Sequence, residues 1–427
     1  MPAGIVSDAG TDGAAQSLNR RAEPGPDLPR RRLLLAGAGL MSTAGLGAVI
    51  WKASRADAAR PRTTATREPP ARRLPAARPR TAATRESPVR RAAIWQAKVS
   101  VPRPQVMAAA DGVVCVAGDQ GVYWTPGAYE MVQTLNARDG SHMWTFTVPT
   151  GGRGESHLDP PDVAVSGGRV YAALDNLTCL RAGDGTKVWS DSVPFTVNLA
   201  AGPDAVYAVQ GTLFALRSRD GTRLWSYPAG AGAMPAPILV NNVLYLLGGD
   251  PRGDPLVLAI RASDGAKLWD SPAPDGGWLA CDGSTVCAMS GVGPDVQVQG
   301  NADLPPPQLW TYQASDGRLL YKSAPDAGFN SAPAMTAGIA CAFTIGKLTA
   351  VNPATGQIMW SYRTTGSPPA AARGRIYTST PEGELVALNA SDGTPVWQCP
   401  IRFTLGPLVA GNTVYVCDHT TLYAVRA

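Results

Sequence analysis

The chain has 427 residues, including 46 Gly and 38 Pro, and 44% of its residues are hydrophobic. So much Gly and Pro excludes a coiled coil or helical bundle, and the hydrophobic share excludes a wholly disordered chain. The formal net charge of +5 is unevenly placed, because residues 1–92 carry 17 Lys and Arg against 7 Asp and Glu. The remainder is mildly acidic, so the basic composition gives no reason to expect nucleic-acid binding.

The first 51 residues have the features of an export signal. Residues 1–32 end in Pro29-Arg30-Arg31-Arg32, and an apolar run follows at 33–51. This pattern resembles a twin-arginine signal and predicts an extracytoplasmic protein, either secreted or anchored to the plasma membrane. Ala56-Asp57-Ala58 is a candidate cleavage site, so a cleaved signal and a retained anchor are both open.

Residues 52–92 are expected to form an extended linker. The stretch 59–68 returns at 77–86, a duplication with a shift of 18 residues. It is rich in Pro and Arg and nearly free of large apolar groups, so it cannot bury a core. It is either a spacer or a basic stalk that contacts anionic lipid or a cell-wall polymer. Membrane contact is expected only through 33–51 and this linker.

From residue 93 onward, one unit of about 42 residues recurs. Its clearest part is a strand, an Asp-Gly turn and a second strand that contains Trp, as in residues 135–144. Asp-Gly between two apolar strands is a strong hairpin signal, because Gly adopts positive φ without steric cost. The Trp position is occupied in turn by Trp95, Trp144, Trp189, Trp225, Trp269, Tyr321, Trp360 and Trp397.

The count of strands predicts how the repeat closes. A strand typified by Val170-Tyr171-Ala172-Ala173 occurs eight times, whereas the turn with its following strand occurs seven times. The missing strand is found before the first unit, at Ala93-Ile94-Trp95-Gln96. Residues 93–427 are therefore predicted to be all-β, an eight-bladed β-propeller closed by pairing of N- and C-terminal strands.

Strands that end in Leu-x-Ala-x-x-Gly/Ser-Asp-Gly-x-x-x-Trp resemble the repeat of the pyrroloquinoline quinone (PQQ) propeller superfamily. That superfamily includes the quinoprotein alcohol dehydrogenases and the propeller lipoprotein of outer-membrane barrel assembly. WD40 repeats are a weaker match, since no Gly-His and Trp-Asp pair recurs. The resemblance implies that the blade Trp side chains pack between neighbouring blades.

The same resemblance bears on cofactors. Quinoprotein dehydrogenases use a vicinal Cys-Cys disulfide with carboxylate and amide ligands around calcium, and no two of the seven cysteines here are adjacent. PQQ with calcium is therefore disfavoured, and no cofactor or metal is expected. Cys115, Cys287 and Cys341 replace the Tyr of the Val-Tyr strand and are expected to be small buried hydrophobes. A disulfide between Cys281 and Cys287 would be off-register and is not expected.

The candidate binding surface follows from loop lengths. The long insertions at 118–131, 150–161, 248–255 and 290–308 are expected on one face of the propeller, and binding residues commonly lie on loops of a rigid scaffold. The alternative is that these insertions arose by drift and have no function. The side chains that these insertions offer are Trp124, Tyr129, Glu155, His157, Asp159, Asp250, Arg252 and Asp254.

Three functions are compatible with this pattern. The first is a non-catalytic scaffold, monomeric, that binds a protein or a cell-envelope polymer on the face with the long loops. The second is an enzyme, either a PQQ-dependent oxidoreductase or a hydrolase or lyase built on Glu155, His157 and Asp159, although a polar loop is the favoured interpretation of those three residues. The third is an extracytoplasmic sensor module. The sequence favours the first, because it lacks a convergent catalytic set.

Overall fold

The computed structural model describes residues 89–120, 128–149, 161–174, 176–191, 198–230, 236–274, 277–290, 308–323, 331–344, 346–364, 366 and 368–427. These residues all belong to one compact unit of the chain. No helix long and apolar enough to cross a membrane occurs among them. The strands in chain order are β1 (Val89–Arg90), β2 (Trp95–Lys98), β3 (Arg103–Ala110), β4 (Val113–Gln120), β5 (Tyr129–Asn136), β6 (His142–Pro149), β7 (Asp162–Ser166), β8 (Arg169–Ala173), β9 (Leu177–Arg181), β10 (Lys187–Asp191), β11 (Asn198–Ala201), β12 (Ala205–Gln210), β13 (Thr212–Arg217), β14 (Arg223–Pro228), β15 (Ile238–Val240), β16 (Val243–Gly249), β17 (Pro255–Arg261), β18 (Lys267–Pro272), β19 (Trp278–Cys281), β20 (Thr285–Met289), β21 (Leu309–Gln313), β22 (Leu319–Lys322), β23 (Ala334–Thr336), β24 (Ile339–Thr344), β25 (Lys347–Val351), β26 (Ile358–Arg363), β27 (Ala370–Ala372), β28 (Arg375–Ser379), β29 (Glu384–Asn389), β30 (Pro395–Arg402), β31 (Leu405–Ala410), β32 (Thr413–Cys417) and β33 (Thr421–Arg426).

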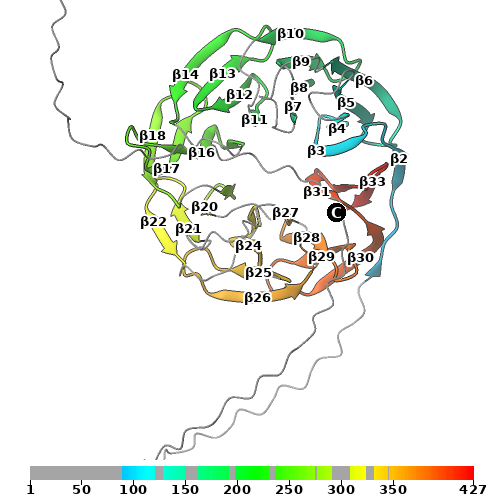
Figure 1. Cartoon of the computed structure of the whole chain (residues 1–427). Coiled ribbons are helices and arrows are strands. Elements are labelled where there is room, and N and C mark those ends of the chain that lie inside the picture. Colours follow the sequence, from blue (N-terminus) through cyan, green and yellow to red (C-terminus); the bar gives the residue numbers. More distant parts are fainter. Residues whose placement is uncertain are drawn as a thin grey trace, which may run out of the picture. The chain divides into compact units, whose positions relative to one another are not determined.

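These strands form eight sheets that follow one another around a ring (Figure 1). Blade 1 consists of β3 to β6, and each later blade takes the next four strands, up to blade 7 with β27 to β30. Blade 8 consists of β31, β32, β33 and β2. The inner strand β3 lies against β7 of blade 2 and against β31 of blade 8. The predicted eight-bladed β-propeller is thereby confirmed.

The ring closes through β2 and the last strand, β33. β2 is antiparallel to β33, with Trp95 opposite Ala424 and Lys98 opposite Thr421 (Figure 1). The predicted closure is confirmed, although the strand begins at Trp95 rather than Ala93. Pairing across the ring removes the free edge that β33 would otherwise expose.

The two ends of the propeller differ in their connections. In each blade we name the strands A to D from the inside outward. Because consecutive strands are antiparallel, the A–B and C–D turns lie at one end, which we call the short-turn end. The B–C and D–A connections lie at the other, which we call the long-loop end.

Blade 7 has a fifth strand that the sequence did not predict. β1 runs parallel to β30, with Val89 opposite Trp397 and Arg90 opposite Gln398. The region expected as linker, 52–92, therefore includes residues that belong to the propeller. Since β30 runs from the short-turn end to the long-loop end, β1 does the same, and the residues before Val89 join the propeller at the short-turn end.

The core lies between the blades. Each hydrophobic cluster among the described residues draws on two neighbouring blades, for example blades 2 and 3. The blade Trp bridges this interface, as Trp189 Nε1 donates a hydrogen bond to the carbonyl of Ser218 in the next blade at 2.9 Å. The C–D turn of that next blade lies on the indole, so that a Cβ added to Gly221 would be 2.8 Å from the ring of Trp189.

Most C–D turns are closed by their own Asp. Asp220 Oδ1 accepts a hydrogen bond from the backbone N–H of Thr222 at 3.0 Å, and bonding from Thr222 lowers the pKa of Asp220. In blade 6 the Asp is replaced by Thr355, whose hydroxyl accepts from the N–H of Gln357 at 3.3 Å. Such side-chain bonds explain why the turns are nearly uniform in length.

Candidate functional site

The strand bounds put all four long insertions at the long-loop end. Segments 121–128 and 290–308 join B to C strands, 150–161 joins a D to an A strand, and 250–254 is a further B–C turn. The short-turn end has compact turns, such as Asp111-Gly112, in which both residues have positive φ. One end is therefore regular, and the other carries the variation in length.

The structure describes four of the eight candidate side chains. Tyr129 is half-buried at the start of β5, and Asp250, Arg252 and Asp254 lie together in the turn between β16 and β17. The other candidates lie outside the described residues; they are Trp124, Glu155, His157 and Asp159. Whether the two groups come together stays a prediction.

The 250–254 turn is held by one carboxylate. Asp250 Oδ1 accepts hydrogen bonds from the backbone N–H groups of Arg252 and Asp254, both at 2.8 Å. The Asp250 N–H in turn donates to the carbonyl of Asp254 at 2.9 Å. Asp250 is thus a structural residue, whereas Arg252 and Asp254 are exposed on a preformed turn. A cation and an anion on a fixed loop suit recognition of a polar partner.

A buried polar cluster lies at the same end of blade 1. Asp119 is 1% exposed and Glu130 is 5% exposed, and they face each other across β4 and β5. Asp119 forms an ion pair with Arg103, and Gln105 Nε2 donates to its carboxylate at 2.9 Å. Sequence reasoning missed this cluster, because its partners come from different strands. The only local signal was a charged residue at the end of an apolar strand.

Asp162 links two blades at this end. Its carboxylate accepts hydrogen bonds from its neighbour Val163 N–H at 2.8 Å and from Leu199 N–H, in blade 3, at 2.7 Å. Burial raises the pKa of Asp162 to about 6, and these two N–H groups act in the opposite direction. In the sequence, Asp162 directly follows the segment that carries Glu155, His157 and Asp159. Asp162 therefore ties the base of that segment to the next blade.

The cysteines are structural. All seven are free thiols. Cys115, Cys287 and Cys341 are fully buried, as expected for residues that replace the Tyr of the Val-Tyr strand. Burial raises the pKa of the Cys115 thiol to about 12 and raises the pKa of Cys287 and Cys341 as well. A thiol that holds its proton so firmly is a poor nucleophile and a poor metal ligand.

A ligand set for a metal is not found in the described part of the chain. No three His, Cys, Asp or Glu residues lie close enough there to hold an ion together. Calcium needs six to eight oxygen ligands, and the carboxylates of Asp119 and Asp162 are already engaged by protein donors. The described residues therefore do not fit calcium with PQQ. His142 and His419 are exposed.

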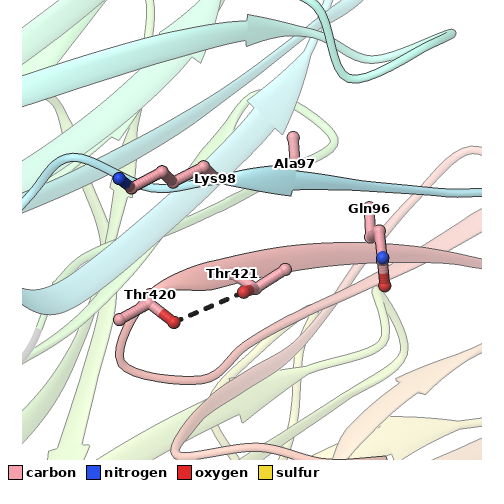
Figure 2. Close-up of a pocket in the computed structure, with 5 residues that line it drawn as sticks. All are labelled: Gln96, Ala97, Lys98, Thr420 and Thr421. Carbon is pink, nitrogen blue, oxygen red and sulfur yellow. Dashed lines mark hydrogen bonds between the residues drawn. The ribbon is translucent and has the colours of Figure 1, made fainter.

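A small hollow lies at the outer edge of the closing blade. It is lined by Gln96, Ala97 and Lys98 of β2 and by Thr420 and Thr421 at the start of β33 (Figure 2). Lys98 is its charged group, and the hydroxyls of the two Thr lie 3.4 Å apart. One charged group and a few uncharged polar side chains are too few convergent groups for a specific small-molecule site.

The charges of the described residues are unequally shared between the two ends. Asp270 is assigned to the short-turn end, where its ion-pair partner Lys267 lies. The short-turn end then has fifteen basic and ten acidic side chains, and the long-loop end has seven basic and nine acidic side chains. The short-turn set is Arg90, Arg91, Arg138, Arg169, Arg181, Lys187, Arg217, Arg219, Arg223, Arg261, Lys267, Arg318, Arg373, Arg375 and Arg426 with Asp111, Asp139, Asp184, Asp204, Asp220, Asp264, Asp270, Asp282, Asp316 and Asp392. Segments outside the described residues that join strands at the long-loop end add, in sequence, seven acidic residues and one Arg. The short-turn end is therefore basic and the long-loop end acidic.

Exposed apolar side chains are also confined to one end. In the described ranges, most of the exposed large hydrophobic side chains are among the first two residues of an outer strand. The others are the first residue of β1 and the residue directly before β2. We call this set the apolar rim; it consists of Val89, Ile94, Leu224, Leu268, Leu319, Ile358 and Met359. Outer strands begin at the short-turn end, so the apolar rim and the basic charge are on the same side.

Comparisons with known proteins agree with this fold. The model of the family described as outer membrane protein assembly factor BamB matches residues 44–198, 128–279 and 344–427. No curated protein matches the chain. Among solved structures, BamB from Moraxella catarrhalis is similar with a TM-score of 0.57 at 15% identity, over 79% of this chain and 100% of that chain.

Two further similar structures come from proteins of different kinds. Sqt1 from Chaetomium thermophilum, solved bound to the N-terminus of the ribosomal protein L10, has a TM-score of 0.58 at 10% identity, over 79% of this chain and 100% of that one. Quinohemoprotein alcohol dehydrogenase ADHIIG from Pseudomonas putida HK5 has a TM-score of 0.52 at 15% identity, over 80% of this chain and 78% of that one. At these identities the likeness shows the fold alone.

Proposed function

The chain belongs to the family described as outer membrane protein assembly factor BamB, and on that premise we propose that it is a non-catalytic, extracytoplasmic scaffold. In this proposal the long-loop end binds a protein partner, and the twin-arginine-like segment directs export. One observation carries the proposal: the long and irregular connections all lie at the long-loop end, opposite turns of nearly fixed length.

The chemistry of that end indicates the kind of partner. The long-loop end is acidic, and the turn at 250–254 presents Arg252 and Asp254 on a rigid base. A partner with a basic contact surface would be attracted to it and oriented by it. A solved propeller of similar fold, Sqt1, was determined bound to a segment of another protein, which supports protein binding as a use of this scaffold.

Site-specific cross-linking tests the proposal. A photoreactive benzoylphenylalanine replaces Asp254 in the full chain, and the matched control carries it in place of Arg138, an exposed turn residue of the short-turn end. We expect irradiation in envelope fractions of the source cells to give a protein adduct of one defined mass from position 254 and none from 138. Equal adducts from both positions, or none from either, would contradict the proposal.

A quinoprotein dehydrogenase is the second candidate, because one such enzyme shares the fold over 80% of this chain. A titration of the full chain with PQQ and calcium, read by Trp fluorescence beside a dye-linked alcohol oxidation assay, separates the two. We expect no saturable quenching and no dye reduction. Saturable quenching with dye reduction would replace the scaffold by an enzyme.

A further inference from the structure

The apolar rim repeats one position of the blade. Leu224, Leu268 and Met359 each come directly before the blade Trp, and Leu319 and Ile358 come one residue earlier in their strands. In blades 3, 4 and 6 the residue before the Trp is the extra residue of a bulge between the C and D strands. Equivalent positions in successive blades lie at the same height on the propeller axis. The apolar side chains therefore form a band along the outer wall of blades 3 to 6, next to the C–D turns.

Basic residues accompany this band. Arg223 and Lys267 come directly before Leu224 and Leu268, and Arg318 comes directly before Leu319. The turn carboxylates are partly neutralised by neighbouring arginines, as in the ion pairs Arg181–Asp184 and Arg261–Asp264. What the short-turn end presents is thus a positive excess next to aliphatic side chains, which is the composition of surfaces that lie on anionic membranes.

The chain outside the propeller arrives at the same end. β1 fixes Val89 at the short-turn end, so residues 1–88 connect there. That stretch contains the apolar run at 33–51 and fifteen Lys and Arg. A stretch that is basic and partly apolar is thus attached to the propeller at the short-turn end.

We propose that the short-turn end is a docking surface for an anionic lipid bilayer. Its Arg and Lys side chains contact the headgroups, and the apolar rim of blades 3 to 6 enters the interface between headgroups and acyl chains. The acidic long-loop end is then directed away from the membrane. This orientation is independent of which partner, if any, the long-loop end binds.

Depth-dependent fluorescence quenching tests the orientation in the full chain. A single introduced thiol carries an NBD label, either through Ile358→Cys, where the side chain is 62% exposed, or through Arg252→Cys at the long-loop end as the matched control. The native thiols compete poorly, since they are buried or half-buried with raised pKa values. The labelled chain is reconstituted in phosphatidylcholine vesicles with or without phosphatidylglycerol, and nitroxide lipids serve as quenchers.

We expect the label at 358 to be quenched in vesicles that contain phosphatidylglycerol, with quenching reversed at high salt, and the label at 252 to stay unquenched. Equal quenching of both labels, or no quenching of either, would overturn the proposal. If the label at 358 were quenched equally in vesicles with and without phosphatidylglycerol, the proposed attraction to anionic headgroups would be wrong. A response at 358 to soluble polyphosphate but not to vesicles would assign the surface to an anionic polymer instead.

Charge variants provide a second, matched comparison. Arg138→Gln with Arg318→Gln removes two positive charges from the short-turn end, and Lys347→Gln with Arg363→Gln removes two from the long-loop end. We expect the first pair to lower the binding constant for vesicles that contain phosphatidylglycerol, read from the label at position 358, about tenfold or more. The second pair should leave this constant unchanged. All four side chains are at the surface, so both pairs should fold. An equal loss in both pairs would contradict a specific docking face.

Discussion

The guanidinium of Arg91 lies over the indole of Trp397, 5.0 Å from the ring centroid. The same side chain donates to the backbone carbonyls of Arg426 and Ala427, at 2.5 and 3.3 Å. Elsewhere a C–D turn of the next blade covers the Trp, but blade 8 has no such turn, because its fourth strand is β2. The Trp397 Nε1 atom is buried and has no hydrogen-bond partner among the described residues. Arg91 therefore occupies the place of the missing turn.

We expect Arg91→Ala to lower the free energy of unfolding by about 1–2 kcal/mol, since it removes a cation–π contact and two hydrogen bonds at the closure. The measurement is urea unfolding followed by Trp fluorescence. Arg90→Ala is the matched control, because Arg90 is exposed and directly precedes Arg91, and its effect should stay within about 0.5 kcal/mol. Equal losses in the two variants would show that Arg91 has no special role.

Substitutions at two glycines distinguish the cost of backbone strain from the cost of a clash with the blade Trp. Gly221 and Gly112 have similar positive φ, +73° and +80°, but a Cβ at Gly221 would meet Trp189, whereas a Cβ at Gly112 would meet nothing within 4 Å. We expect Gly112→Ala to cost about 1 kcal/mol of stability and Gly221→Ala about 2 kcal/mol more. Chemical unfolding of both variants measures the difference. Similar costs would mean that the indole moves aside easily.

The thiols should be nearly inert in the folded protein. Cys281 is half-buried and burial raises its pKa to about 11, while Cys399, which is buried, has its pKa raised to about 11 as well. The thiolate is the reactive form, so we expect slow reaction of Cys281 with Ellman's reagent, with a rate that rises about tenfold per pH unit from pH 7 to 10. All seven thiols should react in guanidinium. Cys281→Ser should abolish the slow phase and Cys115→Ser should not; rapid reaction of several thiols in the folded state would contradict this.

Asp162 should make stability depend on pH. Its pKa is raised from 3.8 to about 6 by burial, so the folded state binds this proton more tightly than the unfolded chain. Its contribution to stability is therefore lost as the pH rises from about 4 to about 6. Asp162→Asn removes this titration, but its single amide oxygen cannot accept from both N–H groups, which bond to different carboxylate oxygens. The variant therefore loses one hydrogen bond at every pH, and only the pH dependence tests the pKa. We expect the free energy of unfolding of the parent, relative to that of Asp162→Asn, to fall by about 1–3 kcal/mol from pH 4 to pH 8. Unfolding curves over that range measure it; a difference between the two proteins that is the same at every pH would contradict the assignment.

The architecture was largely predictable because it is repeated. Seven turns with Gly between apolar strands, and one additional strand at Ala93–Gln96, were enough to count eight blades and to foresee the closure. β1 could not be foreseen: two residues in an Arg-rich stretch carry no hydrophobic period, and their strand pairing depends on the exposed edge of β30. The cluster around Asp119 and the link from Asp162 to Leu199 were missed for the same reason. Their partners are brought together by blade packing and leave no local pattern in the sequence.

The pairing of β2 with β33 also has a consequence for the order of events during synthesis. Trp95 is made before any of the blades and its partner Ala424 after blades 1 to 7, so β2 waits for all of these blades before it can pair. Contacts of such long range are formed late and at high entropic cost. Blades 1 to 7 can assemble progressively as they emerge, but a nascent chain has an unpaired β2 and an open ring until β33 has been made. A premature stop directly before Thr421 would therefore give a chain that contains blades 1 to 7 but cannot close the propeller through β2 and β33.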